Sequence, residues 1–210
     1  MRLYKARSLR WHMDLMRAIY PGWDETYAAE LARRFDLRVD QRMAGFSHGQ
    51  RVKALLLLNL ARRPRLLLLD EPTTGLDPVA RAEVLEALSD VLKEDSRSVL
   101  FSSHNTHDVE QLADAITFLH QGRVLASQDK EGFIDAWRRL VCRGEWTPDR
   151  AQLPELASVH RNGSMLELKV SGYSPDLGAR LQARGLTVCS EHPMNLEDIF
   201  VATVRAGATP

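Results

Sequence analysis

The stretch Leu66-Leu67-Leu68-Leu69-Asp70-Glu71-Pro72 joins four consecutive leucines to two adjacent carboxylates. A short apolar run without alternation is typical of a strand that is buried on both faces of a parallel sheet. Ligands bind at the carboxyl ends of such strands, where both carboxylates fall. Asp70 is therefore a candidate for holding Mg²⁺ through water, and Glu71 for a base that orients an attacking water. In a purely structural alternative, Asp70 caps the turn that follows.

The sequence after this stretch alternates between helix and strand patterns. The pair Asp77-Pro78 predicts a helix that continues to about residue 92, because proline is favoured at the first helical position. We expect a second strand over 98–102, adjacent to the strand over 66–70, with both in the centre of the sheet. A hairpin is predicted around Gln121-Gly122. These patterns indicate a parallel α/β core.

Helices are predicted on the amino-terminal side of the leucine run, and a mixed segment on its carboxyl-terminal side. The expected upstream helices cover 8–20, 24–35 and 47–63. Downstream we expect a helix over 131–142, a hairpin over 159–170, a helix over 177–184, a short strand over 186–189 and a last helix over 196–204.

The composition is that of a globular chain. Of the 210 residues, 44% are hydrophobic and 27% are charged, which excludes a disordered chain. Basic and acidic side chains each number 28, so a generally basic nucleic-acid-binding protein is not expected. Residues 1–65 nevertheless carry 14 basic and 6 acidic side chains. This segment either suits an acidic partner, a phosphate or an anionic lipid surface, or forms a solvated arginine-rich face.

The cysteine content and the apolar segments indicate where the protein works. Cys142 and Cys189 are the only cysteines and lack metal-site spacing, which favours a reducing compartment. Residues 1–10 hold no apolar segment of signal-peptide length. The most apolar stretch, residues 54–69, contains three arginines and is too polar to span a bilayer. We expect a cytoplasmic protein that can lie against a membrane.

Three further motifs accompany the leucine run. Residues 46–50, Phe-Ser-His-Gly-Gln, begin a predicted helix, where backbone N–H groups and the helix dipole favour an anion, although an ordinary helix cap has the same sequence features. Residues 75–78, Gly-Leu-Asp-Pro, form a turn and a helix start that need no functional explanation. His104 follows the second strand, where it either donates to a phosphate oxygen or has a structural role.

Together, the four motifs resemble those of the ATP-binding-cassette (ABC) ATPases. Their order agrees, and the separations of 20 residues from Gln50 to Asp70 and 33 from Glu71 to His104 fit the same family. Residues 46–50 resemble the signature motif, residues 67–71 the Walker B strand, residues 75–78 the D-loop and His104 the switch histidine. Residues 20–24 and 195–200 are similar to the exporter ATPases that serve ABC-2-type permeases.

The sequence departs from the family pattern at three points. Phe46 stands where leucine is usual, and His48 stands where glycine is usual. No glycine is followed by lysine, so the phosphate-binding loop (Walker A) is missing, as is the glutamine loop (Q-loop). Residues 2–4 resemble the segment just after the glutamine loop. The chain therefore resembles a cassette that begins almost halfway along its length.

The resemblance implies an incomplete P-loop NTPase fold of the ABC type. Residues 1–130 are then the ATPase domain, with a helical subdomain over about 5–50 and a catalytic core over about 51–128. Residues 131–210 are a small α/β extension. Glu71 and His104 are implied as catalytic, Asp70 as the Mg²⁺ ligand through water, and Ser47, His48, Gly49, Gln50 and Asp77 as ATP-binding.

The function implied is that of the ATPase subunit of an ABC exporter, with ATP and Mg²⁺ as ligands. A second ATPase subunit and an integral-membrane permease are its implied partners, on the inner face of the membrane. We expect residues 1–65 to dock on the permease, with apolar contacts from Trp11, Met13, Met16 and Trp23. The isolated chain is expected to be inactive.

Two alternatives remain. One is a non-catalytic partial cassette or regulatory fragment that caps a complete partner. The other is a chromosome-maintenance or translation-factor ATPase of the same superfamily, although the coiled coils or paired cassettes of those proteins are missing from the sequence.

Overall fold

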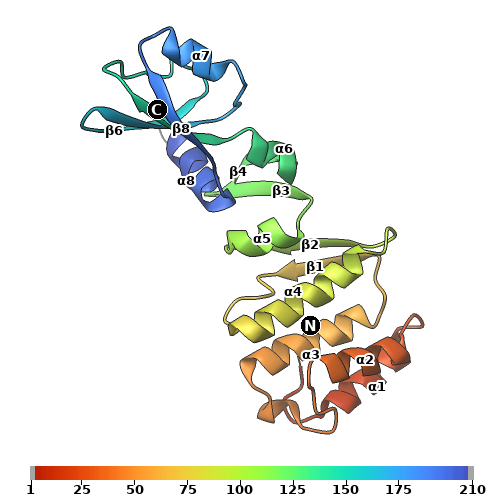
Figure 1. Ribbon diagram of the computed structural model, residues 1–210. Coiled ribbons are helices and arrows are strands. Elements are labelled where there is room, and N and C mark those ends of the chain that lie inside the picture. The colour runs from red at the N-terminus through yellow and green to blue at the C-terminus, as the bar shows by residue number, and fades with distance from the viewer. Residues whose placement is uncertain (1–2, 208–210) are drawn as a thin grey trace. The chain divides into compact units, whose positions relative to one another are not determined.

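The computed structural model describes residues 3–207 and divides the chain into two compact units (Figure 1). The first unit ends at Asn105 and the second begins at Thr106. Arg2, part of the segment likened to the region after a glutamine loop, lies outside the described residues. None of the helices within 3–207 has both the length and the apolar character needed to cross a bilayer.

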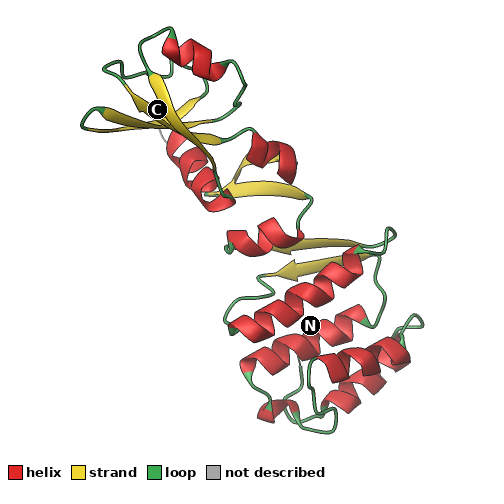
Figure 2. Ribbon diagram, in the orientation of Figure 1, coloured by secondary structure: helices red, strands yellow, loops and turns green. Residues whose placement is uncertain are grey.

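The first unit is mostly helical (Figure 2). Its elements agree with the predicted ones to within a few residues: α1 (Leu9–Ile19), α2 (Glu25–Arg34), a 3₁₀ turn (Met43–Gly45), α3 (His48–Leu60), β1 (Leu66–Asp70), α4 (Pro78–Leu92) and β2 (Ser98–Ser102). Helix α3 packs against α1, α2 and α4, and α4 packs against β2. Because α3 has neighbours on several sides, its leucines at 56, 57, 58 and 60 are all buried.

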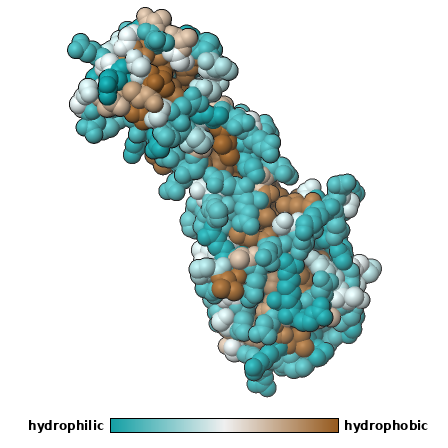
Figure 3. All heavy atoms as spheres, viewed as in Figure 1, coloured by the Kyte–Doolittle hydropathy of each residue, from teal (hydrophilic) through white to brown (hydrophobic). Residues whose placement is uncertain are grey.

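Strands β1 and β2 pair in parallel, with Leu66 opposite Ser98 and Asp70 opposite Ser102. Their predicted adjacency is confirmed, but their predicted central position is wrong for the described residues, where they form a two-stranded sheet. Leu66, Leu68 and Leu100 are 56%, 64% and 65% exposed, whereas Leu67, on the opposite face of β1, is buried. Hydrophobic residues reach the surface of this unit in Figure 3. The apolar runs have the pattern of central strands, but one face of the sheet stays uncovered among the described residues.

Two of the apolar residues expected to contact a membrane partner are instead core residues. Met13 and Met16 point into the first unit and are only 7% and 6% exposed. The helical spacing of α1 places them on its buried face. Trp11 and Trp23 are half-buried, so part of each ring stays at the surface.

The second unit contains two antiparallel sheets and four helices among its described residues. Its elements are α5 (Thr106–Leu112), β3 (Ala115–His120), β4 (Arg123–Asp129), α6 (Lys130–Asp135), β5 (Arg138–Arg143), β6 (Leu156–Asn162), β7 (Met165–Val170), α7 (Leu177–Gln182), β8 (Thr187–Pro193) and α8 (Leu196–Gly207). β3 and β4 form the predicted hairpin, and the other sheet has the order β6-β7-β5-β8.

The compact second unit begins earlier than the domain boundary expected at residue 130. Phe118 of the β3–β4 hairpin shares a buried cluster with Phe133 of α6 and Ile199 of α8. The ring centroids of Phe118 and Phe133 are 5.2 Å apart. Because the hairpin shares its core with these later elements, its contacts place it with the second unit.

The helix expected over 131–142 is wrong in its second half. Helix α6 ends at Asp135, and β5 follows between β7 and β8. Leu140 and Cys142 alternate into the core and are fully buried, which is the pattern of a strand. Burial raises the pKa of the Cys142 thiol to about 11. Cys142 and the exposed Cys189 are both free thiols.

Asp24 gives a stability test for the helical part of the first unit. Its carboxylate accepts from the Tyr27 N–H at 2.8 Å and pairs with Arg63 at 2.9 Å. The Tyr27 hydrogen bond, opposed by partial burial and aided by Arg63, lowers the pKa of Asp24. Asp24→Ala should lower the free energy of unfolding by about 0.5–2 kcal/mol at neutral pH.

The difference in unfolding free energy between the wild type and Asp24→Ala should become smaller in acid. A carboxyl with a lowered folded-state pKa stabilises the fold above its unfolded pKa of about 3.9, and the effect disappears as the pH falls through the folded value. Urea unfolding at several pH values measures the difference. Glu30→Ala, which removes an exposed carboxylate from the same helix, should change the free energy by less than about 0.5 kcal/mol. Equal losses for both variants would contradict the capping role.

Candidate functional site

The candidate site lies at the carboxyl ends of β1 and β2. Asp70 and Ser102 are opposite each other in the register, and the Ser102 hydroxyl donates to Asp70 Oδ1 at 2.6 Å. The parallel pairing thus brings the last residues of the two strands to one edge. Asp70 keeps its second carboxylate oxygen for a further partner, because only Oδ1 accepts from Ser102.

Glu71 turns the chain away from the sheet. Its φ is +48°, a left-handed conformation that is uncommon for a residue with a Cβ. The Glu71 N–H donates to the backbone oxygen of Ser102 at 3.2 Å and to its hydroxyl at 3.1 Å. These contacts with the neighbouring strand hold the turn, and such strain is concentrated at functional sites in proteins.

The Glu71 side chain reaches across to His104. Oε1 accepts from the His104 backbone N–H at 3.0 Å, and Oε2 lies 2.8 Å from His104 Nδ1. The Thr74 hydroxyl also donates to Oε2, at 2.8 Å. Partial burial raises the pKa of this carboxyl, but the hydrogen bonds from His104 and Thr74 outweigh it and hold the pKa below its usual value. Glu71 is therefore ionised at neutral pH and fixed in direction.

The start of α3 is built as the sequence predicts. Ser47 accepts from the Gln50 N–H at 3.1 Å, and Gln50 Oε1 accepts from the Ser47 N–H at 2.9 Å, which completes a capping box. Phe46 is buried, while Ser47 and His48 are exposed. A Cβ added to Gly49 would lie 3.5 Å from the Ala80 side chain, an ordinary packing distance.

The turn after Glu71 links this helix start to the carboxylate. His48 Nε2 lies 3.1 Å from the Thr74 backbone oxygen, and the Thr74 hydroxyl holds Glu71. His48 of the motif over residues 46–50 is thereby connected, through Thr74, to Glu71 of the motif over residues 67–71. Sequence reasoning did not single out Thr74, and it placed Ser102 only at the end of the second strand before His104; its pairing with Asp70 is the signal that assigns Ser102 to the site.

Asp77 has a structural task at the start of α4. Its side chain accepts from the Val79 and Ala80 N–H groups, each at 3.0 Å, with Pro78 next in the chain. The Ala80 hydrogen bond, opposed by a small desolvation effect and aided by Val79, lowers the pKa of Asp77. The predicted helix start is confirmed, and nucleotide binding by Asp77 stays a prediction.

Asp70 is the one residue predicted to hold a metal ion. Within residues 3–207, no group of three or more His, Cys, Asp and Glu side chains is placed to hold a metal ion. Proteins usually bind Mg²⁺ through one or two carboxylates, with water and substrate phosphates completing the shell. Asp70, with one oxygen free of Ser102, fits that limited role.

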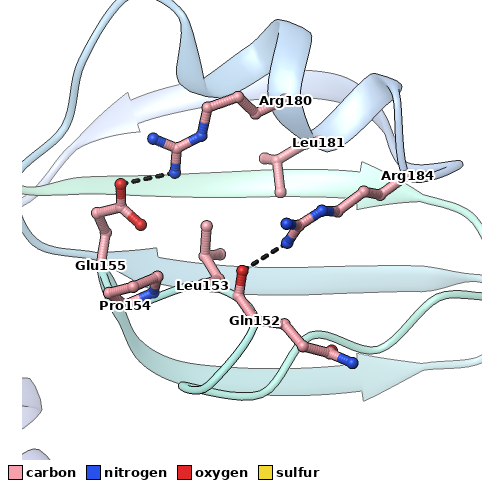
Figure 4. Close-up of a pocket in the computed structure, with 7 residues that line it drawn as sticks. All are labelled: Gln152, Leu153, Pro154, Glu155, Arg180, Leu181 and Arg184. Carbon is pink, nitrogen blue, oxygen red and sulfur yellow. Dashed lines mark hydrogen bonds and ion pairs between the residues drawn. The ribbon is translucent and has the colours of Figure 1, made fainter.

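A pocket in the second unit does not add a candidate site. It has a volume of about 260 Å³ and lies between α7 and the segment before β6 (Figure 4). Arg180 donates to Glu155 at 2.6 Å, and Arg184 donates to the Gln152 backbone oxygen at 2.5 Å. Both guanidinium groups already have acceptors within the unit, so the pocket is explained by the contacts that hold α7 in place.

The part of the chain that matches a protein-family model includes the whole candidate site. The model described as "AAA domain, putative AbiEii toxin, Type IV TA system" matches residues 28–107. This range includes the start of α3, both strands of the first unit and His104.

Sequence relatives extend the similarity to the second unit. ABC transporter ATP-binding protein YtrB of Bacillus subtilis (strain 168) is 29% identical over 191 residues, which are 90% of this chain and 65% of that protein. Nod factor export ATP-binding protein I of Rhizobium johnstonii is 32% identical over 176 residues, 80% of this chain and 55% of that protein. The chain thus spans between about half and two thirds of the length of these relatives.

A solved structure shows the same fold. An ATP-binding subunit of an ABC transporter aligns with a TM-score of 0.54 and 31% identity, over 61% of this chain and 55% of that one.

Proposed function

This chain is a homologue of the ATP-binding proteins of ABC transporters, and on that basis we propose that it hydrolyses ATP as the nucleotide-binding subunit of an exporter. The observation that carries the proposal is the placement of Glu71 and His104 beside Asp70, at the carboxyl ends of two parallel strands. In P-loop NTPases this edge faces the γ-phosphate and its attacking water.

Each residue of the site has a task in that reaction. Glu71, ionised and held by Thr74, orients the attacking water and accepts its proton. His104 moves from Glu71 to donate to a phosphate oxygen, which frees a carboxylate oxygen for the water. Asp70 would hold Mg²⁺ through water, and that ion supplies charge neutralisation on the phosphates when it is bound.

We propose that an amino-terminal part of the same cassette supplies the phosphate loop. The 210 residues contain no such loop. The exposed Leu66, Leu68 and Leu100 support this, because both faces of a parallel sheet are normally covered, and a further part of the cassette would cover this one. In such a cassette, residues 47–50 act on the nucleotide of a second subunit, which suits the exposure of Ser47 and His48 at the start of α3.

Export is proposed from the relatives and from residues 20–24 and 195–200. One relative bears the name Nod factor export ATP-binding protein. The first unit would dock on an integral-membrane permease at the inner face of the membrane, with the half-buried Trp11 and Trp23 and the exposed Tyr4 available for contact.

Cysteine crosslinking tests the docking surface. Ala18→Cys, on the exposed part of α1, should crosslink to the permease in membranes, in a background where the exposed Cys189 is changed to Ser. Gln182→Cys, exposed in the second unit, is the matched control and should give little product. Immunoblotting of the linked species measures both. Crosslinks from Gln182→Cys alone would contradict docking through the helical part of the first unit.

A further inference from the structure

One side chain ties the start of α3 to the turn that follows β1. His48 Nε2 lies 3.1 Å from the Thr74 backbone oxygen. Because a carbonyl oxygen only accepts hydrogen bonds, the ring must carry a proton on Nε2. Gly75 leaves room for the ring: its φ is +73°, and a Cβ there would lie 3.3 Å from His48 Nε2.

Thr74 continues the path to the carboxylate. Its hydroxyl donates to Glu71 Oε2 at 2.8 Å, and the same oxygen lies 2.8 Å from His104 Nδ1. Both His48 and Thr74 are exposed, so their contact is not imposed by core packing. It exists because residue 48 has a side chain of the right reach, where the resembled family usually has glycine.

We propose that His48 is a positioning residue, which fixes the backbone at Thr74 so that the Thr74 hydroxyl orients the Glu71 carboxylate. The inference rests on the proposed function, in which Glu71 is the base. Residues 47–50 then serve two sites: the partner's nucleotide through the start of α3, and the base of their own chain through His48.

The first experiment uses the full 210-residue chain and needs no nucleotide. Gln carries its side-chain nitrogen at the same number of bonds from Cα as His Nε2, whereas Asn is one bond shorter. His48→Gln should therefore keep the contact with Thr74, and His48→Asn should lose it. Long-range ¹H–¹⁵N NMR at about pH 8, above the ordinary His pKa of about 6.5, identifies the protonated ring nitrogen. Three-bond couplings report the Thr74 χ1 rotamer.

The expected result is a proton on Nε2 of His48 and a single Thr74 rotamer in the wild type. The rotamer should be retained in His48→Gln and averaged in His48→Asn. A proton on Nδ1 alone, or a Thr74 rotamer indifferent to His48→Asn, would overturn the proposal. Neither outcome depends on ATP hydrolysis.

The second experiment uses mixed dimers of the complete cassette, with the phosphate loop supplied. These dimers distinguish an effect of His48 on Glu71 of the same subunit from an effect on the nucleotide bound to the partner subunit. In the first arrangement, one subunit carries His48→Asn and the other carries Glu71→Gln. In the second, one subunit carries both changes and the other is wild type. The subunit with intact Glu71 has the altered residue 48 only in the first arrangement.

The first arrangement should release phosphate about two- to tenfold more slowly than the second, with a change in kcat rather than KM, because a neutral hydrogen bond is lost near the base. His48→Gln in place of His48→Asn should restore the rate of the first arrangement. Equal rates, or a slower second arrangement, would overturn the positioning role. If wild-type dimers release no phosphate, the proposed function fails instead, and the NMR result still decides the contact.

Discussion

An assembly that includes the phosphate loop and carries Glu71→Gln is expected to turn over ATP about 10²–10⁴-fold more slowly than the wild type, while ATP stays bound. The substitution removes the proton acceptor but keeps the size of the side chain. Its amide oxygen can still accept from the His104 backbone N–H. Its amide nitrogen faces the Thr74 hydroxyl and the His104 ring, and both of these can accept.

The measurement is steady-state phosphate release together with retention of labelled ATP. Glu86→Gln is the matched control, because Glu86 is exposed and pairs with Arg34 on the helical side of the unit. It should release phosphate at close to the wild-type rate. A Glu71→Gln assembly with more than about a third of the wild-type rate would show that Glu71 is not the base. An inactive wild-type assembly would instead favour a non-catalytic partial cassette.

Much of the first unit can be predicted from the sequence, because its signals are local. Asp24 and Asp77 accept from the first-turn N–H groups that their positions predict. Pro64 follows α3 by a few residues, and the leucine run forms β1. Each of these signals acts within a few residues along the chain, so no knowledge of distant contacts is needed.

The errors in the predicted elements and surfaces have different causes. A helix is predicted over 131–142, but residues 138–143 form a strand, because they pair with β7 on one side and β8 on the other. Met13 and Met16 are predicted to contact a membrane partner, although the helical spacing of α1 already places them on its buried face. Tertiary packing overrides local preference only for the strand.

The candidate site also combines features that the sequence predicts with features that only the structure shows. Glu71 and His104 each follow one of two strands predicted to be adjacent, and His104 Nδ1 lies 2.8 Å from Glu71 Oε2. The proposed role of Thr74 depends on the left-handed turn at Glu71 and on the contact with the His48 ring, and the motifs predict neither. Side-chain contacts of exposed residues follow from geometry that only the structure supplies.

The 210-residue chain alone should bind ATP weakly and release no phosphate above background. Phosphate binding in P-loop NTPases needs the backbone N–H groups and the lysine of a loop that this sequence does not contain. Asp70, Glu71 and His104 contact an ion, a water and one phosphate oxygen in the proposed site, which leaves the rest of the triphosphate without donors. Glu71 is also held by three hydrogen bonds within the unit, so no free carboxylate awaits a water.

Phosphate release by the wild-type chain, compared with Glu71→Gln at the same concentration, checks this expectation. Both should give the background rate, and fluorescence titration with a labelled ATP should show no saturable binding at micromolar concentrations. Adding the missing cassette portion, by fusion to the amino terminus, should restore hydrolysis in the wild type only. Turnover by the isolated wild-type chain that Glu71→Gln removes would mean that the chain fixes the triphosphate by itself, and the proposed need for an added phosphate loop would be wrong.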